Sequence, residues 1–217
     1  MNRRLSSHSI WIVPVLFIIL VVSFSAYVWS ETQVDHAYEL RYKSYRLADE
    51  LRHSSDDLTL MARAYVITGD SHYKDNYQSI LDIRNGKKPR LEGYHNYYSD
   101  KAINEQPSAQ PSDRIKSIPL LALIRQLGTS DEEFHKLDEA KSNSDALAVI
   151  EIKAMALVED QSADANKMRA QAIRMLHDNQ YIKAKAAIMQ PIDEFFTLMD
   201  QRTLTNVQTA TRYADYV

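Results

Sequence analysis

One apolar segment near the N-terminus limits what this chain can become more than any other feature. Residues 10–29 read IWIVPVLFIILVVSFSAYVW and contain no charged side chain. At about 1.5 Å per residue, a helix of this length crosses the roughly 30 Å hydrocarbon core of a bilayer. Trp11, Tyr27 and Trp29 lie near its two ends, where amphipathic aromatic rings favour the membrane–water interface. The segment therefore predicts a transmembrane helix at 10–29.

The charges on either side of this segment predict its orientation. Arg3 and Arg4 precede it, whereas Glu31 and Asp35 follow it. By the positive-inside rule, residues 1–9 form a cytoplasmic arm and residues 30–217 lie outside. In a bacterium this corresponds to a single pass through the inner membrane and a periplasmic domain. A cleaved signal peptide is the alternative, although the apolar run exceeds the roughly 7–15 residues of a signal-peptide core.

The rest of the chain has the composition and the spacing of a helical protein. The whole chain has only 4 glycines and 6 prolines among its 217 residues. Two stretches repeat apolar or small residues at alternating intervals of three and four, the pattern of a narrow helix–helix seam. We expect an all-α fold, in which the transmembrane helix continues into an antiparallel extracytoplasmic helical bundle. The first seam comprises Ala37, Leu40, Ser44, Leu47, Leu51, Ser54, Leu58, Met61 and Tyr65. The second comprises Ile192, Phe196, Met199, Thr203, Asn206, Ala210, Tyr213 and Val217.

Turn and cap residues divide the region between the seams into shorter helices. Gly69 is expected to end the first long helix, and Asp70 or Ser71 can cap the second one. Ser130 with Glu133 has the spacing of a capping box. Pro191 is expected either to kink the last helix or to begin its final section. The stretch 87–113 contains three prolines and is interpreted as a long surface loop. Helices are predicted at 72–84, 117–127, 131–158, 162–176 and from 181 onward.

Several kinds of chemistry are not expected in this chain. It has no cysteine, and its 26 Lys and Arg are offset by 29 Asp and Glu, which argues against disulfides, thiol catalysis and nucleic-acid binding. Its 7 histidines include no pair four residues apart, so we expect no metal site. No glycine-rich phosphate loop or nucleophile motif occurs, so we expect neither a cofactor nor an enzyme.

Tyrosine and basic residues concentrate in the region from Arg63 to Tyr98. Tyrosine offers an apolar face with a hydroxyl group, and arginine grips carboxylates with two donors. These residues predict a site for a small anionic or polar ligand at the membrane-distal end of the bundle. The alternative is that the tyrosines pack the loop onto the bundle while Lys87 and Lys88 are solvated. The candidate ligand-binding residues are Arg63, Tyr65, Tyr73, Tyr77, Arg84, Lys87, Arg90 and Tyr94.

Four stretches carry a resemblance to a known group of receptors. Residues 47–70 (LADELRHSSDDLTLMARAYVITGD) resemble the first sensor helix of bacterial chemoreceptors and transmembrane sensor histidine kinases. Residues 77–94, 128–154 and 176–203 are similar to later parts of one subset of these proteins. Their periplasmic domains are four-helix-bundle or helical bimodular ligand-binding domains.

The resemblance implies a sensory domain that forms a homodimer through its first helix. In such receptors a second membrane helix follows, and then a kinase, chemotaxis or cyclase module. This chain ends at Val217, before either one. We therefore expect it to be the N-terminal part of a longer receptor or a truncated product. A membrane-anchored helical scaffold that binds another protein is the alternative function.

Overall fold

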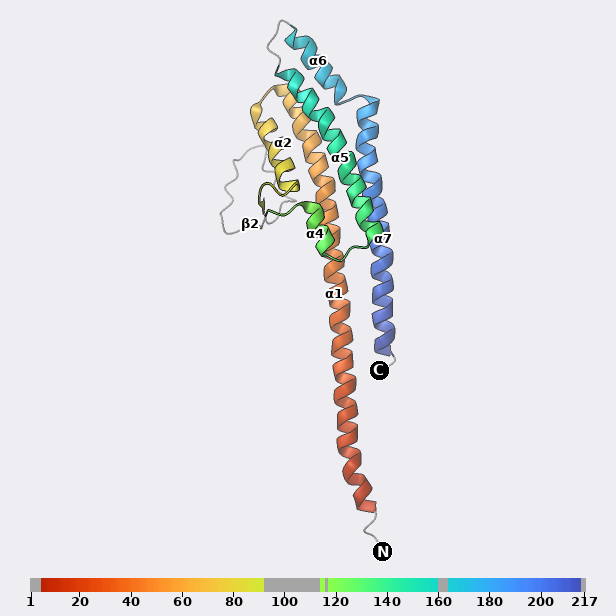
Figure 1. Cartoon of the computed structure of the whole chain (residues 1–217). Helices are drawn as coiled ribbons and strands as arrows, with labels where there is room; N and C mark the ends of the chain where they lie inside the picture. The colour runs from red at the N-terminus through yellow and green to blue at the C-terminus, as the bar shows by residue number, and fades with distance from the viewer. Residues whose placement is uncertain (1–4, 92–113, 116, 160–163, 216–217) are drawn as a thin grey trace. The chain divides into compact units, whose positions relative to one another are not determined.

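The chain is all-α across the residues that its structure describes. The structure, a computed structural model, describes residues 5–91, 114–115, 117–159 and 164–215. Within them lie six helices and one antiparallel pair of two-residue strands, β1 (Arg90–Leu91) and β2 (Arg114–Ile115) (Figure 1). The helices are α1 (Leu5–Thr68), α2 (Ser71–Arg84), α4 (Leu120–Gln126), α5 (Asp131–Val158), α6 (Ala165–Met175) and α7 (Asn179–Asp215).

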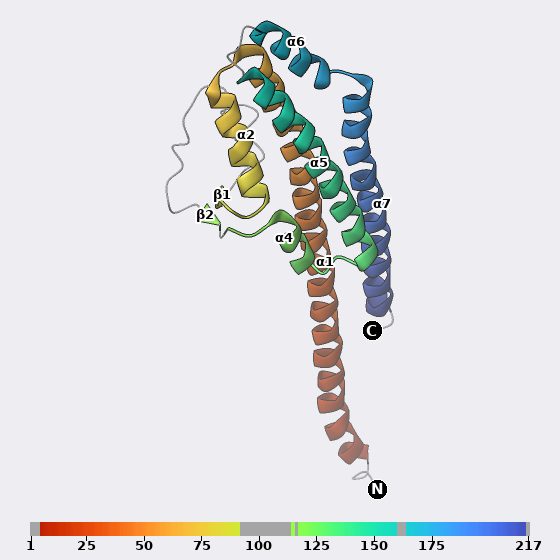
Figure 2. The ribbon, with the colours of Figure 1, turned by 45° about the horizontal axis from the view of Figure 1, so that its top comes forward.

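The helices form two compact units, each described here by itself. Unit 1 consists of Met1–Tyr42 with Met199–Val217, and unit 2 consists of Lys43–Leu198. In unit 2, α5 runs in the same direction as the α1 segment, while α2 and α7 run in the opposite direction (Figures 1 and 2). This arrangement confirms the predicted antiparallel packing of helices.

The core of unit 2 follows the seams seen in the sequence. Leu51, Leu58 and Met61 of α1 are buried, as are the small seam residues Ser44 and Ser54. Burying one large apolar side chain contributes about 1.5–3 kcal/mol, so this stripe fixes which face of α1 meets the other helices. From the other helices, the core takes Tyr77, Ile80, Ile124, Leu137, Ala140, Leu147, Tyr181, Ile188, Ile192 and Phe195.

The local signals at three helix ends act as predicted. Gly69 adopts a φ of 74° and its N–H donates to the carbonyl of Tyr65 (2.7 Å), which closes α1. Asp70 caps α2 by accepting a hydrogen bond from the N–H of His72 (2.9 Å). Ser130 and Glu133 form the reciprocal capping box that opens α5.

The last helix starts slightly earlier than predicted. It begins at Asn179 rather than near Tyr181, because the side chain of Asp178 accepts from the N–H of Tyr181 (2.7 Å). It also continues through Pro191 as one helix. Proline has no N–H to offer the carbonyl of Ala187, four residues earlier. The side chain of Asn143 on α5 donates to that carbonyl instead (3.0 Å).

Other element boundaries also moved. α4 begins at Leu120, directly after Pro119, and not at 117. α6 spans Ala165–Met175, inside the predicted 162–176. The expected loop 87–113 includes β1, whose Arg90 pairs with Ile115 of β2. Residues 92–113 lie outside the described residues.

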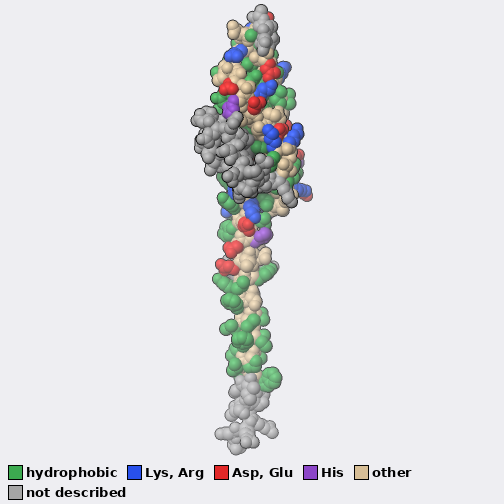
Figure 3. All heavy atoms as spheres, turned by 90° about the vertical axis from the view of Figure 1, so that its left-hand side faces the viewer, with side chains coloured by type: hydrophobic (Ala, Val, Ile, Leu, Met, Phe, Trp, Pro, Cys, Tyr) green, Lys and Arg blue, Asp and Glu red, His purple; other side chains and the backbone are tan. Residues whose placement is uncertain are grey.

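Unit 1 contains the apolar segment and a helix pair. In the described residues, α1 is the one helix long and apolar enough to cross a bilayer, and its apolar window is not buried at all. Trp11 and Trp29 expose 71% and 62% of their surface. Figure 3 shows hydrophobic side chains along this segment. Such a helix is either a membrane span or a signal sequence.

Beyond the apolar segment, α1 lies beside the final part of α7. Arg41 of α1 holds Asp200 of α7 with two nitrogen donors, at 3.1 and 2.8 Å from the same carboxylate oxygen. Trp29 and Thr209 line one cavity together, so the two helices run antiparallel in this unit. Of the predicted second seam, Met199 and Thr203 are buried and Asn206 is exposed. Tyr213 and Val217 have no described side chain.

Candidate functional site

A buried carboxylate joins the helices of unit 2. Glu151 of α5 is only 1% exposed. It accepts hydrogen bonds from Tyr181 Oη (2.5 Å), Tyr77 Oη (2.9 Å) and Thr59 Oγ1 (3.2 Å). These donors lie on α7, α2 and α1, so three other helices meet α5 at one side chain. We call these four residues the Glu151 cluster.

The position of Glu151 follows from the spacing of residues along α5. Leu137, Ala140, Ser144 and Leu147 alternate intervals of three and four, and Glu151 is the next member of this buried row. The spacing in the sequence puts Glu151 on the buried face of α5, but it did not predict that Glu151 would be the centre of a polar cluster. A charged residue continuing an apolar row was the available signal, because a buried carboxylate needs hydrogen-bond donors.

Burial dominates the electrostatics of the cluster. It raises the pKa of Glu151, while the hydroxyl donors and the charge of Lys185 act in the opposite direction. Burial likewise raises the pKa of Tyr77 and of Tyr181, and the Glu151 charge adds to both shifts. Both phenols therefore keep their protons and serve as hydrogen-bond donors.

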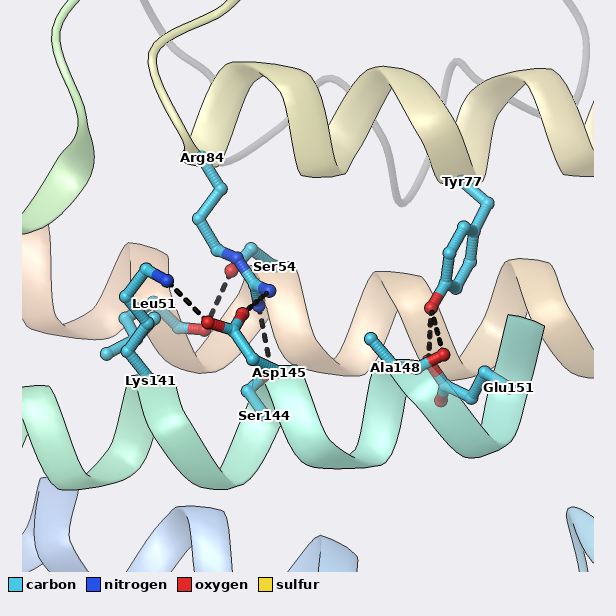
Figure 4. Close-up of polar contacts among 9 residues, drawn as sticks. All are labelled: Leu51, Ser54, Tyr77, Arg84, Lys141, Ser144, Asp145, Ala148 and Glu151. Atoms are coloured by element: carbon cyan, nitrogen blue, oxygen red, sulfur yellow. Dashed lines mark hydrogen bonds and ion pairs between the residues drawn. The ribbon is translucent and has the colours of Figure 1, made fainter. Parts of the chain in front are cut away.

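A second polar layer lies one heptad away from the cluster. Arg84 of α2 donates from Nη1 to Ser144 Oγ and from Nη2 to Asp145 Oδ1, each across 2.7 Å (Figure 4). Lys141 donates to the other oxygen of Asp145 (2.5 Å). Tyr77 and Arg84 are seven residues apart on α2, as Ser144 and Glu151 are on α5. Polar contacts therefore repeat at the heptad interval along the contact between α2 and α5.

Arg63 and Tyr65, two further residues of the predicted ligand site, form contacts between helices. Arg63 donates from Nε and Nη2 to the carbonyl of Leu176, at 3.1 and 2.8 Å, and lies over the ring of Tyr181. Tyr65 donates to Glu159 (3.4 Å), which also pairs with Lys74. Arg63 thus satisfies a carbonyl just after α6.

The other predicted residues are scattered. Arg90 is buried with its Nε 2.8 Å from Glu50 Oε1 of α1. Lys87 is exposed, and Tyr73 is half-buried beside the ring of His72. Tyr94 lies outside the described residues. The structure thus brings Tyr77 and Arg84 to the same face of α5, and Arg63 beside Tyr181; ligand binding by the predicted set stays a prediction.

Unit 1 holds a half-open cavity of about 360 Å³ between α1 and α7. Its lining includes Trp29, His36, Arg41, Arg202 and Asn206. None of the seven predicted ligand residues that the structure describes lines it. Arg41 in its wall already pairs with Asp200.

Comparison with known proteins identifies no family for the chain. No protein-family model, curated protein or solved structure matches it. Within the described part of the chain, no group of three or more His, Asp or Glu side chains is arranged to hold a metal ion. The features that bear on function are therefore the long apolar helix, the helical bundle and its polar contacts.

Proposed function

We propose that this chain is the extracytoplasmic sensory domain of a bacterial transmembrane signalling receptor, of the sensor histidine kinase or chemotaxis type. Residues 10–29 anchor it in the inner membrane, with residues 1–9 in the cytoplasm and residues 30–217 in the periplasm. The observation that carries the proposal is the antiparallel pair of α1 and α7 beside the exposed apolar segment, joined by Arg41 and Asp200.

The same two helices also take part in the core of unit 2. There the Glu151 cluster connects Thr59 of α1 and Tyr181 of α7 to α5. A ligand that favours one packing of these helices over another changes the position or the dynamics of α1 and α7. Such coupling between sites typically amounts to about 1–3 kcal/mol. The buried small residues Ser44 and Ser54 allow α1 more than one close packing.

The proposed ligand is a small anionic or polar molecule bound in the region of Arg63 to Tyr94. Support comes from the tyrosine and arginine content of that region and from the exposed Lys87 within it. The proposed assembly is a homodimer formed through α1. Leu60 and Ile67 of this helix, two turns apart, expose 46% and 56% of their surface. Exposed apolar residues at that interval suit a contact between helices.

Ligand screening of the full chain in nanodiscs tests the proposal. Organic acids and amino acids are added singly, and the unfolding temperature is measured. At least one compound is expected to raise it, since a ligand that binds only the folded state stabilises that state. Lys87→Ala is expected to reduce the shift, whereas Lys153→Ala, an exposed lysine on α5, is not. If no compound raises the unfolding temperature of the folded chain, the sensory proposal fails.

One observation favours a second candidate, a membrane-anchored scaffold that binds another protein. Arg63, Tyr77 and Arg84 each donate hydrogen bonds within the bundle, which leaves fewer of their polar atoms for a small ligand. Crosslinking in intact cells distinguishes the two. One dominant protein partner, retained when Arg63 or Arg84 is substituted and present without any small ligand, supports the scaffold.

A further inference from the structure

The hydroxyl groups of the Glu151 cluster have more acceptor atoms within reach than they have protons to donate. Tyr181 Oη lies 2.5 Å from Glu151 Oε1 and 3.1 Å from Thr59 Oγ1. Thr59 Oγ1 in turn lies 3.2 Å from Glu151 Oε1 and 3.1 Å from the carbonyl of Ser55. Each hydroxyl has a single proton and two acceptors within reach.

With Glu151 ionised, every polar proton in the cluster has an acceptor. Tyr181 and Tyr77 donate to the two carboxylate oxygens, at 2.5 and 2.9 Å. Thr59 donates either to the carboxylate or to the Ser55 carbonyl. These bonds to a charged acceptor are the stronger kind of hydrogen bond, and they connect α5 to α2 and α7.

With Glu151 protonated, the same atoms also satisfy one another. The new carboxyl O–H donates to Tyr181 Oη across the 2.5 Å contact. Tyr181 then turns its own proton toward Thr59 Oγ1 (3.1 Å), and Thr59 donates to the Ser55 carbonyl (3.1 Å). Tyr77 still donates to the other carboxyl oxygen. No buried donor is left without a partner, which would otherwise cost about 1–3 kcal/mol.

We infer that Glu151 is a proton-binding site of the folded chain, and that proton uptake reverses the hydrogen bond between Tyr181 and Glu151 and turns the Tyr181 proton toward Thr59. The ligand is the proton itself, taken up from the aqueous phase around unit 2. The inference does not depend on the proposed small-molecule ligand, although Tyr77 belongs both to the predicted ligand-binding residues and to the cluster.

The surrounding charges leave the carboxylate without a directly paired cation. From α7, Lys185 favours the ionised form through its charge, but it pairs with Asp56 (2.7 Å) and donates to Ser55 Oγ (3.2 Å). From α2, Arg84 pairs with Asp145, and from α1, Arg63 binds the Leu176 carbonyl. Among the described residues, none of these cations forms an ion pair with Glu151. Neutralising a buried carboxylate with no paired cation relieves its desolvation cost.

Proton uptake also changes how strongly the helices are held together. It converts charge-assisted bonds from Tyr77 and Tyr181 into neutral ones, which are roughly half as strong. The same step removes the desolvation cost of the buried charge, and the raised pKa of Glu151 indicates that this gain outweighs the weaker hydrogen bonds in the folded chain.

Infrared difference spectroscopy of the full chain in nanodiscs tests the inference. Spectra recorded at a series of pH values, from neutral down to below the ordinary carboxyl value of 4.5, are expected to develop the C=O band of a buried, protonated carboxylic acid. Its midpoint is expected above the ordinary carboxyl value of 4.5. Glu151→Gln is expected to lose this band, whereas Glu139→Gln, an exposed glutamate on the same helix, keeps it. The absence of such a band in the wild-type chain, or its persistence in E151Q, overturns the inference.

Tyr181→Phe provides a second, independent readout that does not require E151Q to fold. It removes the shortest hydrogen bond to the ionised form, so the midpoint of the band is expected to move to higher pH. An unchanged midpoint in folded Y181F contradicts the inference. Small-molecule binding plays no part in either measurement, so failure here leaves the ligand proposal standing.

Discussion

Tyr181 and Glu151 lie 30 residues apart in the sequence, and their side chains meet across 2.5 Å in the core of unit 2. The contact joins α7 to α5, and Thr59 extends it to α1. A buried carboxylate is stable only with donors around it, so this contact is expected to contribute directly to the folding free energy.

Tyr181→Phe is expected to lower the free energy of unfolding by about 1–3 kcal/mol, because Glu151 loses its shortest donor while staying buried. Urea denaturation of the chain in nanodiscs, followed by circular dichroism, measures the change. Tyr38→Phe is the matched control, since Tyr38 is exposed. Equal stability of the two variants would show that the Tyr181 hydroxyl does not support the fold.

The contribution of Glu151 to the stability of the chain is expected to fall as pH rises above the ordinary carboxyl value of 4.5. The pKa of Glu151 is raised in the folded state, so the folded chain binds this proton more tightly than the unfolded chain. The stabilisation is complete below the ordinary carboxyl value of 4.5 and is lost as pH rises through the folded pKa. The difference in unfolding temperature between wild type and E151Q isolates this contribution from other groups. A difference that does not vary with pH contradicts it.

Arg84→Lys is expected to destabilise the chain by about 1–3 kcal/mol, although the charge is retained. Arg84 reaches Ser144 and Asp145 with two separate nitrogens, and a lysine ammonium cannot reproduce that fork. Arg125→Lys is the control, because Arg125 forms a half-exposed pair with Asp131. Unfolding midpoints in urea compare the two variants. A smaller loss in R84K than in R125K would contradict the role of the buried contact.

Asn143 and Pro191 are expected to be energetically coupled. Asn143→Ala removes the donor to the Ala187 carbonyl and should cost about 0.5–1.5 kcal/mol. In a Pro191→Ala background, the new N–H at position 191 takes over that carbonyl, so N143A should cost less. A double-mutant cycle measures the coupling free energy. Additive effects of the two substitutions would rule out the compensation.

Much of the fold could be predicted because its signals are local in sequence. Gly69 ends α1, Asp70 caps α2, and Ser130 with Glu133 opens α5, as each expected cap predicts. The spacing of the first seam correctly predicts which face of α1 is buried.

The candidate site could not be predicted in this way, because it depends on contacts between distant segments. Thr59 and Glu151 are 92 residues apart, and nothing in either segment specifies the other as its partner. The sequence predicted Tyr77 and Arg84 as ligand-binding residues, because tyrosine and arginine are equally suited to binding a ligand and to forming buried contacts between helices. Their partners Glu151, Ser144 and Asp145 are what reveal their packing role. Likewise, Pro191 alone did not indicate that Asn143 would stabilise a continuous α7.

Cysteine labelling in intact bacterial cells tests most directly whether α1 anchors this bundle outside the cytoplasm. The chain has no cysteine of its own, so Lys153→Cys on the exposed face of α5 and Ser7→Cys before the apolar segment give unambiguous single sites. With a membrane-impermeant maleimide, K153C is expected to react in intact cells, and S7C only after lysis, with both chains in the membrane fraction. Labelling of S7C but not K153C in intact cells, or recovery of either chain from the soluble cytoplasm, would contradict the account.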